Sequence, residues 1–99
     1  MKHYYIYILA NKKNGSLYIG FTDNILRRIW QHKSKLIKGF TSKYNIENLV
    51  YLESYDNPID GIKREKQLKK WKRSWKIKLI EENNPDWEDL YNKILVLLI

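Results

Sequence analysis

Two short runs of alternating apolar and aromatic residues stand near the start of the chain. Residues 5–9 (YIYIL) and 17–21 (LYIGF) are rich in the β-branched and aromatic side chains that strands favour. Residues 11–15 between them end in Asn-Gly, the pair that most strongly indicates a tight hairpin turn. This pattern predicts an antiparallel β-hairpin.

The two faces of the predicted hairpin differ in chemistry, because successive side chains of a strand point to opposite faces. One face collects aliphatic side chains, and we expect it to be buried. The other collects phenols around a glycine, and we expect it to leave room for a ligand to approach. The aliphatic face holds Ile6, Ile8, Leu17, Ile19 and Phe21, and the phenolic face holds Tyr5, Tyr7, Tyr18 and Gly20.

A helix is predicted after the hairpin, since apolar residues recur there at helical spacing and form a stripe that would pack on the core. Asp23 or Asn24 would cap its start and Gly39 would end it. Arg28 and His32 are four residues apart at the margin of the stripe, from where they would lean over the phenolic face. The stripe consists of Ile25, Leu26, Ile29, Trp30, Leu36 and Ile37.

The second half of the chain predicts one more strand and further helices. Residues 49–54 have strand composition, and a helix is expected to start near residue 59, break near residues 73–74 and continue to about residue 82. Residues 85–91 predict a last short helix. We therefore expect an α/β (α+β) fold in which a small three-stranded antiparallel sheet is flanked by helices.

The length of the chain suits one domain with one core, so we expect a single domain over residues 1–99. Its motifs lie within about residues 3–80, and residues 81–99 form a helical, apolar tail. The tail is too apolar to lie alone in water, so it either packs on the core or forms a homodimer surface. The chain has no cysteine and no long apolar run, from which we expect a cytoplasmic location and no membrane segment.

The charge of the chain is strongly positive and unevenly distributed. Nineteen Lys and Arg residues against eleven Asp and Glu residues give +8. Residues 63–78 hold nine basic residues and one acid, whereas residues 81–89 hold five acids and no base. Such a balance favours a polyanionic partner, with nucleic acid first and an anionic membrane surface second. Charge alone also fits lysines that only keep a small protein in solution.

An ordered set of residues in this chain resembles a known family, the GIY-YIG endonucleases. The set comprises residues 5–7 (YIY), residues 18–20 (YIG) after ten intervening residues, and then Arg28, His32 and Glu65. Tyr5 stands where the family signature has its first glycine, which is a departure. The resemblance implies a GIY-YIG-like fold and metal-dependent hydrolysis of phosphodiester bonds, in DNA rather than RNA, in repair or recombination. It also implies low sequence specificity, since the family's usual target-recognition domain does not fit in a chain of this length.

The same resemblance implies a role for each residue of the set. Tyr7 would be the general base, with Tyr18 supporting it. Arg28 would contact the scissile phosphate, and His32 would move a proton or hold a phosphate oxygen. Glu65 would hold one Mg²⁺ or Mn²⁺ ion. These residue types suit the chemistry, because a guanidinium is a planar fork for phosphate and Mg²⁺ prefers one or two carboxylates. A phenol with an ordinary pKa of ~10 needs a nearby cation to act as a base at neutral pH.

Each of these residues also has an ordinary structural explanation. Tyr7 and Tyr18 would pack across the strands of any hairpin. Glu65 would form ion pairs along a basic helix, and a lone helix histidine is more often inert. The corresponding alternative function is a nucleic-acid-binding module that has lost catalysis or needs a partner. Many family members carry an asparagine about a dozen residues after the glutamate, and the nearest ones here are Asn83 and Asn84.

The expected nucleic-acid surface combines the basic helix with the polar loop at residues 40–45. Trp71 and Trp75 share a stripe with Leu68 and Leu79, which predicts core packing rather than base stacking for both tryptophans. The residues expected to bind nucleic acid are Gly20, Arg27, Lys33, Lys43, Tyr44, Lys63, Arg64, Lys66, Lys69 and Lys70.

Overall fold

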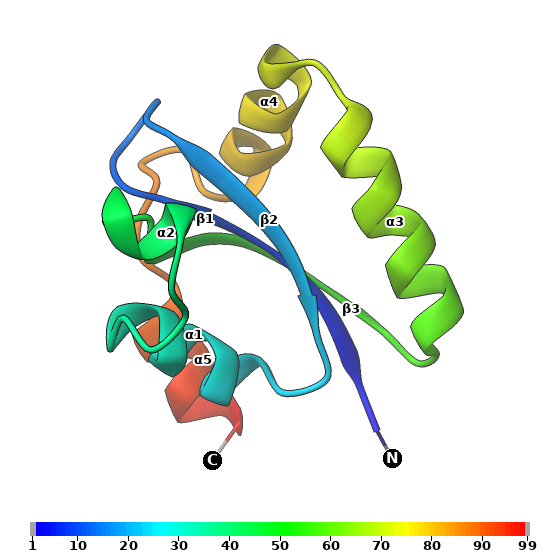
Figure 1. Cartoon of the computed structure of the whole chain (residues 1–99). Helices are drawn as coiled ribbons and strands as arrows, with labels where there is room; N and C mark the ends of the chain where they lie inside the picture. Colours follow the sequence, from blue (N-terminus) through cyan, green and yellow to red (C-terminus); the bar gives the residue numbers. More distant parts are fainter. Residues whose placement is uncertain (1, 99) are drawn as a thin grey trace.

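The computed structural model describes residues 2–98. Its strands form one antiparallel sheet in the order β2-β1-β3, and helices cover both faces of this sheet (Figure 1). The strands are β1 (Tyr4–Ala10), β2 (Leu17–Thr22) and β3 (Asn48–Tyr55). The helices are α1 (Ile25–Lys33), α2 (Phe40–Lys43), α3 (Pro58–Lys70), α4 (Arg73–Asn83) and α5 (Tyr91–Leu98). The predicted α+β fold with a three-stranded antiparallel sheet is confirmed.

The central strand β1 is buried on both faces. Ile6 and Ile8 pack with side chains of α3 and α4, whereas Tyr7 and Leu9 pack with side chains of α1 and α5. All four side chains are 0% exposed. The expectation of an open phenolic face is therefore wrong at Tyr7, because α1 and α5 cover that side of the sheet (Figure 1).

The pairing of the strands differs on the two sides of β1. The hairpin with β2 is regular and places Tyr7 opposite Gly20. The pairing with β3 contains a β-bulge, which the register shift between Ile8 and Leu9 marks. Such a bulge bends its strand and increases the local twist. The carbonyl of Val50, in the bulge, accepts a hydrogen bond at 3.0 Å from the segment that follows α4.

Helix α1 is shorter than predicted, and its buried side is different. Asn24 caps it as expected, since the Asn24 side chain accepts a hydrogen bond from a backbone N–H of the first turn. Trp30 and Leu36 are 52% and 58% exposed, so their prediction as core residues was wrong. Trp30 points away from the buried side of the helix, where His32 is buried beside the isoleucines.

The chain after α4 corrects the predicted helix at residues 85–91. Residues 84–90 form no helix, and α5 starts only at Tyr91. The buried side chain of Asn84 exchanges hydrogen bonds with the backbone of Glu88, and Trp87 has a φ of +56°. Polar side chains that bond the backbone in this way compete with helix formation.

Helix α5 places the apolar tail partly in the core. Ile94 is 8% exposed and packs in the same cluster as Tyr7, whereas Val96, Leu97 and Leu98 are exposed. Across the described residues, no helix combines the length and the apolar character that crossing a bilayer would require.

Candidate active site

The Tyr7 side chain lies across strand β2 towards the edge of the sheet. A Cβ atom on Gly20 would lie 2.2 Å from Cζ of Tyr7 and 2.3 Å from its hydroxyl oxygen. Strand β2 is the outermost strand on this side. The phenol therefore reaches the β2 edge through space that only a glycine leaves open.

The Tyr7 hydroxyl meets His32 of α1 in a buried hydrogen bond. Its oxygen is 3.1 Å from Nε2 of His32, and Nδ1 of the same ring is 3.3 Å from Oγ1 of Thr41 in α2. The three residues are only 0%, 3% and 6% exposed. Because a neutral imidazole carries one N–H, His32 donates one of these two hydrogen bonds and accepts the other.

His32 is neutral at physiological pH. Burial and the nearby positive charge of Arg28 lower its pKa from 6.5 to about 4. Both causes disfavour the imidazolium, which would be a buried cation close to another cation. The ring is therefore neutral at pH 7, and its unprotonated nitrogen can accept a hydrogen bond or a proton.

Three more residues of the predicted set lie around the Tyr7 hydroxyl. The ring of Tyr18 is 6.3 Å from that of Tyr7, centre to centre, and 5.6 Å from that of His32. Burial raises the pKa of Tyr7 well above 10, and the neighbouring Tyr18 and Glu65 act in the same direction. Arg28 is close enough to oppose this shift. The phenol is therefore a protonated hydroxyl at neutral pH.

Glu65 reaches this edge from α3, the helix on the opposite face of the sheet. A Cβ atom on Gly61 would lie 2.7 Å from Cε1 of Phe21, so α3 crosses β2 at very close range. Gly61 and Glu65 are four residues apart and lie on the same side of the helix. The close contact thus turns Glu65 towards β2. The side chain of Glu65 is 20% exposed and has Lys69 Nζ at 3.6 Å.

Glu65 fits the role of a ligand for a hard divalent ion. Within residues 2–98, no three His, Cys, Asp or Glu side chains converge as a closed metal cage would require. Mg²⁺ does not need such a cage, since it is held by one or two carboxylates and completes its shell with water and phosphate oxygens. A single, partly exposed carboxylate such as Glu65 suits an ion of this kind, whereas a structural zinc site needs four protein ligands.

The residues predicted to bind nucleic acid divide into two groups. Some are engaged within the fold: Arg64 pairs with Glu53 at 2.9 Å, Lys33 pairs with Asp89, and Gly20 lies under the Tyr7 ring. We therefore leave Arg64 and Lys33 out of the nucleic-acid surface. The remaining residues are exposed on α1, α3 and the end of α2: Arg27, Lys43, Tyr44, Lys63, Lys66, Lys69 and Lys70.

The two tryptophans that were predicted to be core residues behave differently. Trp71 is half-buried and packs against the core cluster, as predicted. Trp75 is 51% exposed, so the prediction was wrong for this residue. The buried Asn84 is occupied by hydrogen bonds to the backbone and is not part of the site around Tyr7.

Two residues that support the site were missed in the sequence. Gly61 could have been found from the sequence, because an isolated glycine inside a predicted helix often marks a close packing contact. Thr41 could not, since its contact with His32 depends on how α2 folds back over α1. Its place in a polar stretch at residues 40–45 is typical of a solvent-exposed loop.

Comparison with known proteins gives the family. The sequence profile of the GIY-YIG catalytic domain matches residues 3–78. A UPF0213 protein of Staphylococcus saprophyticus is 38% identical over 82 residues, which are 83% of this chain and 99% of that protein. A UPF0213 protein of Syntrophus aciditrophicus is 38% identical over 84 residues, 84% of this chain and 95% of that protein.

A solved structure shares the fold as well. The solution NMR structure of a UPF0213 protein from Bacillus halodurans superposes with a TM-score of 0.55 at 28% identity. The match covers 88% of this chain and 92% of that one. The chain belongs to the GIY-YIG family, a family of nucleases that act on nucleic acid.

Proposed function

We propose that this protein is a metal-dependent endonuclease that hydrolyses phosphodiester bonds of DNA with little sequence specificity, in DNA repair or recombination. One observation carries the proposal: side chains from β2, α1 and α3 converge on the hydroxyl of Tyr7, a residue of the central strand whose ring reaches the β2 edge of the sheet. These side chains are Tyr18, Arg28, His32 and Glu65. They provide a fixed cation, a proton acceptor and a carboxylate that could hold a metal ion, at one edge of the fold.

Arg28 is the proposed contact of the scissile phosphate. Among the described residues it forms no ion pair with a carboxylate, so its guanidinium is available to an anion. A planar guanidinium suits two oxygens of a phosphate group. Phosphoryl transfer depends mainly on such positioning and on stabilisation of the charge that develops on the oxygens.

Tyr7 and His32 form the proposed proton path. Because the pKa of Tyr7 is raised, Tyr7 does not start as a phenolate. We propose that its oxygen takes a proton from the attacking water while its own proton passes to Nε2 of His32. This step requires Nδ1 of His32 to carry the proton and donate to Thr41. A phosphate bound at Arg28 offsets one of the two causes that lower the pKa of His32, which favours the transfer.

Glu65 is the proposed ligand of one Mg²⁺ or Mn²⁺ ion. When bound, such an ion supplies positive charge to the phosphate oxygens and lowers the pKa of a coordinated water. Glu65 itself holds a negative charge close to Tyr7, which opposes formation of a phenolate there. A cation held by Glu65 would offset this charge, which would lower the pKa of Tyr7 and favour loss of its proton.

Nucleic acid is the proposed substrate because of the exposed basic side chains on α3, and the family resemblance favours DNA over RNA. Phosphate contacts of this kind are independent of sequence and weaken steeply as salt increases. They support a nuclease that is directed by the shape of its substrate more than by its base sequence.

A cleavage panel tests the proposed function. Supercoiled, nicked, branched and single-stranded DNA are incubated with the wild type, Glu65→Ala and Arg28→Ala, each with Mg²⁺ or Mn²⁺. We expect cleavage by the wild type and a loss of about 100-fold or more in both variants. Asp60→Asn is the matched control, since Asp60 is an exposed acid on the same helix. No cleavage by the wild type, or equal cleavage by Glu65→Ala, would contradict the proposal.

A second candidate is a nucleic-acid-binding module without turnover. The complete burial of Tyr7 favours it, because a general base must reach the attacking water. Tight, salt-dependent binding of DNA by a wild type that cleaves none of the four substrates would support this candidate.

We also propose that α5 mediates a homodimer. The family profile ends at residue 78 and leaves α5 outside it. Val96 and Leu97 are 76% and 79% exposed, and a hollow lined by Tyr5, Leu52 and Ile94 lies beside Leu97. Pairing of two copies would remove this apolar surface from water.

A further inference from the structure

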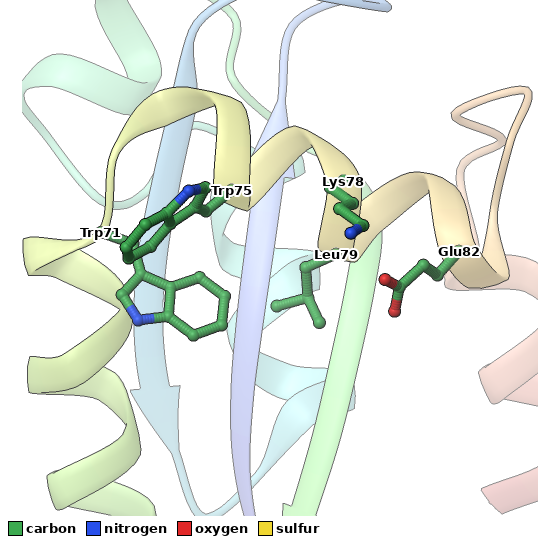
Figure 2. A pocket seen from close by; sticks show the side chains of 5 residues that line it. All are labelled: Trp71, Trp75, Lys78, Leu79 and Glu82. Atoms are coloured by element: carbon green, nitrogen blue, oxygen red, sulfur yellow. The ribbon is translucent and has the colours of Figure 1, made fainter.

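A hollow of about 300 Å³ lies where α3 passes into α4, away from the Tyr7 site. Its walls are Trp71, Trp75, Lys78, Leu79 and Glu82 (Figure 2). The two indole rings lie together at one end of it, and the carboxylate of Glu82 lies at the other (Figure 2). This hollow has no part in the chemistry proposed above.

The two indoles form an open aromatic corner. Their ring centres are 5.9 Å apart and their planes are nearly perpendicular, at 84°. Trp71 is fixed from behind, since it packs on the core and has the guanidinium of Arg64 at 5.0 Å from its ring centre. Trp75 projects from this support and is 51% exposed. Trp71 therefore supports the hollow from the core side, and Trp75 offers a large aromatic surface to solvent.

The surroundings of this corner are positively charged. The ammonium group of Lys72 lies 5.7 Å from the centre of the Trp75 ring, and Lys78 lines the hollow. The only carboxylate in the wall is that of Glu82, at the end far from the indoles. The exposed basic residues of α3, α4 and the turn between them are Lys63, Lys66, Lys69, Lys70, Lys72, Arg73 and Lys78.

We propose that this hollow binds an unpaired nucleobase of the DNA substrate, stacked on Trp75. An aromatic side chain set in a positively charged surface is the combination by which proteins bind single strands, because every base has a face that stacks and every nucleotide has a phosphate. Charge complementarity selects this occupant over an apolar protein segment, which would gain nothing from the lysines. Glu82 would repel a phosphate at its end of the hollow, so the flanking phosphates would lie nearer the indoles, where Lys72 is 5.7 Å from the Trp75 ring centre.

The proposal rests on the proposed function and deepens it, since it assigns a substrate class. A nuclease with such a site would prefer DNA with an unpaired stretch, such as a flap, a gap or a branch, over a continuous duplex. In a paired duplex the bases are stacked on one another and none is free to stack on Trp75.

Fluorescence anisotropy tests the proposal without any cleavage. A labelled 12-nucleotide single strand and a blunt hairpin duplex are titrated in EDTA with the Glu65→Gln protein, alone and with Trp75→Ala. We expect Trp75→Ala to weaken single-strand binding by about 5- to 150-fold and duplex binding by less than about twofold. The dependence on salt should stay the same, because no phosphate contact is removed. Trp30→Ala is the matched control, since Trp30 on α1 is 52% exposed and Trp75 is 51% exposed.

A conservative variant provides a second readout. Stacking of a base on an indole quenches the indole fluorescence. The single strand should therefore quench the wild type and Trp30→Phe more strongly than Trp75→Phe, which keeps a ring for binding but leaves only Trp71 to report from the hollow. Equal quenching of both variants, or single-strand binding by Trp75→Ala within twofold of its parent, would overturn the proposal. If the protein shows the expected binding but cleaves no DNA, the proposed nuclease function is contradicted and the proposed base-binding site stands.

Discussion

Tyr7 and Gly20, which pair across β1 and β2, share a single side-chain space. The Tyr7 ring fills the volume that a Cβ atom at residue 20 would occupy, with ring carbon Cζ 2.2 Å from that position. The glycine thus decides where the phenol goes. With a side chain at residue 20, the hydroxyl could not lie beside His32, 3.1 Å from Nε2.

Gly20→Ala is expected to move the phenol and to destabilise the fold. Forcing one methyl group into a packed core typically costs about 1–3 kcal/mol. We expect the free energy of unfolding to fall by this amount and any cleavage activity to fall with it. In a Tyr7→Ala background the added methyl has room, so there the same substitution should cost close to nothing. Urea unfolding of the four proteins measures the coupling, and equal costs in both backgrounds would contradict it.

Gly61→Ala is expected to push α3 away from β2. Alanine favours helix over glycine by about 1 kcal/mol, but its Cβ would lie 2.7 Å from the Phe21 ring. We expect the clash with Phe21 to cost more than the helix propensity of alanine contributes. The free energy of unfolding should therefore fall, and Glu65 should be displaced. Combining Gly61→Ala with Phe21→Leu should restore part of the stability, which thermal unfolding measures. A Gly61→Ala protein more stable than wild type would show that the ring moves aside at little cost.

His32 should make the protein less stable in mild acid. Its pKa is about 4 in the fold and 6.5 as the ordinary value, so the unfolded chain binds the proton more readily. The contribution of neutral His32 is complete above pH 6.5 and is lost as the pH falls towards 4, up to about 3 kcal/mol. Urea unfolding between pH 7 and 5 should show a smaller decline in His32→Gln than in wild type. An equal decline in His32→Gln and wild type would contradict this.

Arg64 is expected to stabilise the fold rather than to bind DNA. Its guanidinium donates to both carboxylate oxygens of Glu53, and Tyr55 donates to the same carboxylate. Burial raises the pKa of Glu53, but these hydrogen bonds outweigh it and the net pKa is lowered. Arg64→Lys should cost about 1–3 kcal/mol of stability. The salt dependence of DNA binding should be the same in Arg64→Lys as in wild type. Lys66→Ala, at an exposed lysine of α3, should reduce the salt dependence.

The exposed side of α5 should decide the oligomeric state. We expect Val96→Ser with Leu97→Ser to convert a dimer into a monomer, because both side chains are more than 70% exposed in the single chain. Light scattering after size exclusion measures this, and the variant should remain folded by circular dichroism, since Ile94 remains in the core. Leu36→Ser, at another exposed apolar residue, is the control. A monomeric wild type would contradict the proposed dimer.

Local patterns were sufficient to predict much of the fold. The hairpin followed from two β-branched runs around Asn-Gly, and the α3–α4 break was placed within a few residues. The helix at residues 85–91 was wrong, because the side chain of Asn84 bonds the backbone of that segment and β3 at the same time. The bond to β3 joins residues 34 apart in the chain, and neither bond leaves a periodic trace in the sequence.

For the candidate site, too, some features could be predicted from the sequence and others depend on tertiary packing. The order of Tyr7, Arg28, His32 and Glu65 was sufficient to name a family, because residue types and their spacing can be read directly along the chain. Tertiary packing alone decided that Tyr7 is fully buried, that Thr41 contacts His32, and that Trp75 stands in solvent. Periodicity shows that a helix has an apolar side, but only the neighbouring elements determine which of its residues they cover.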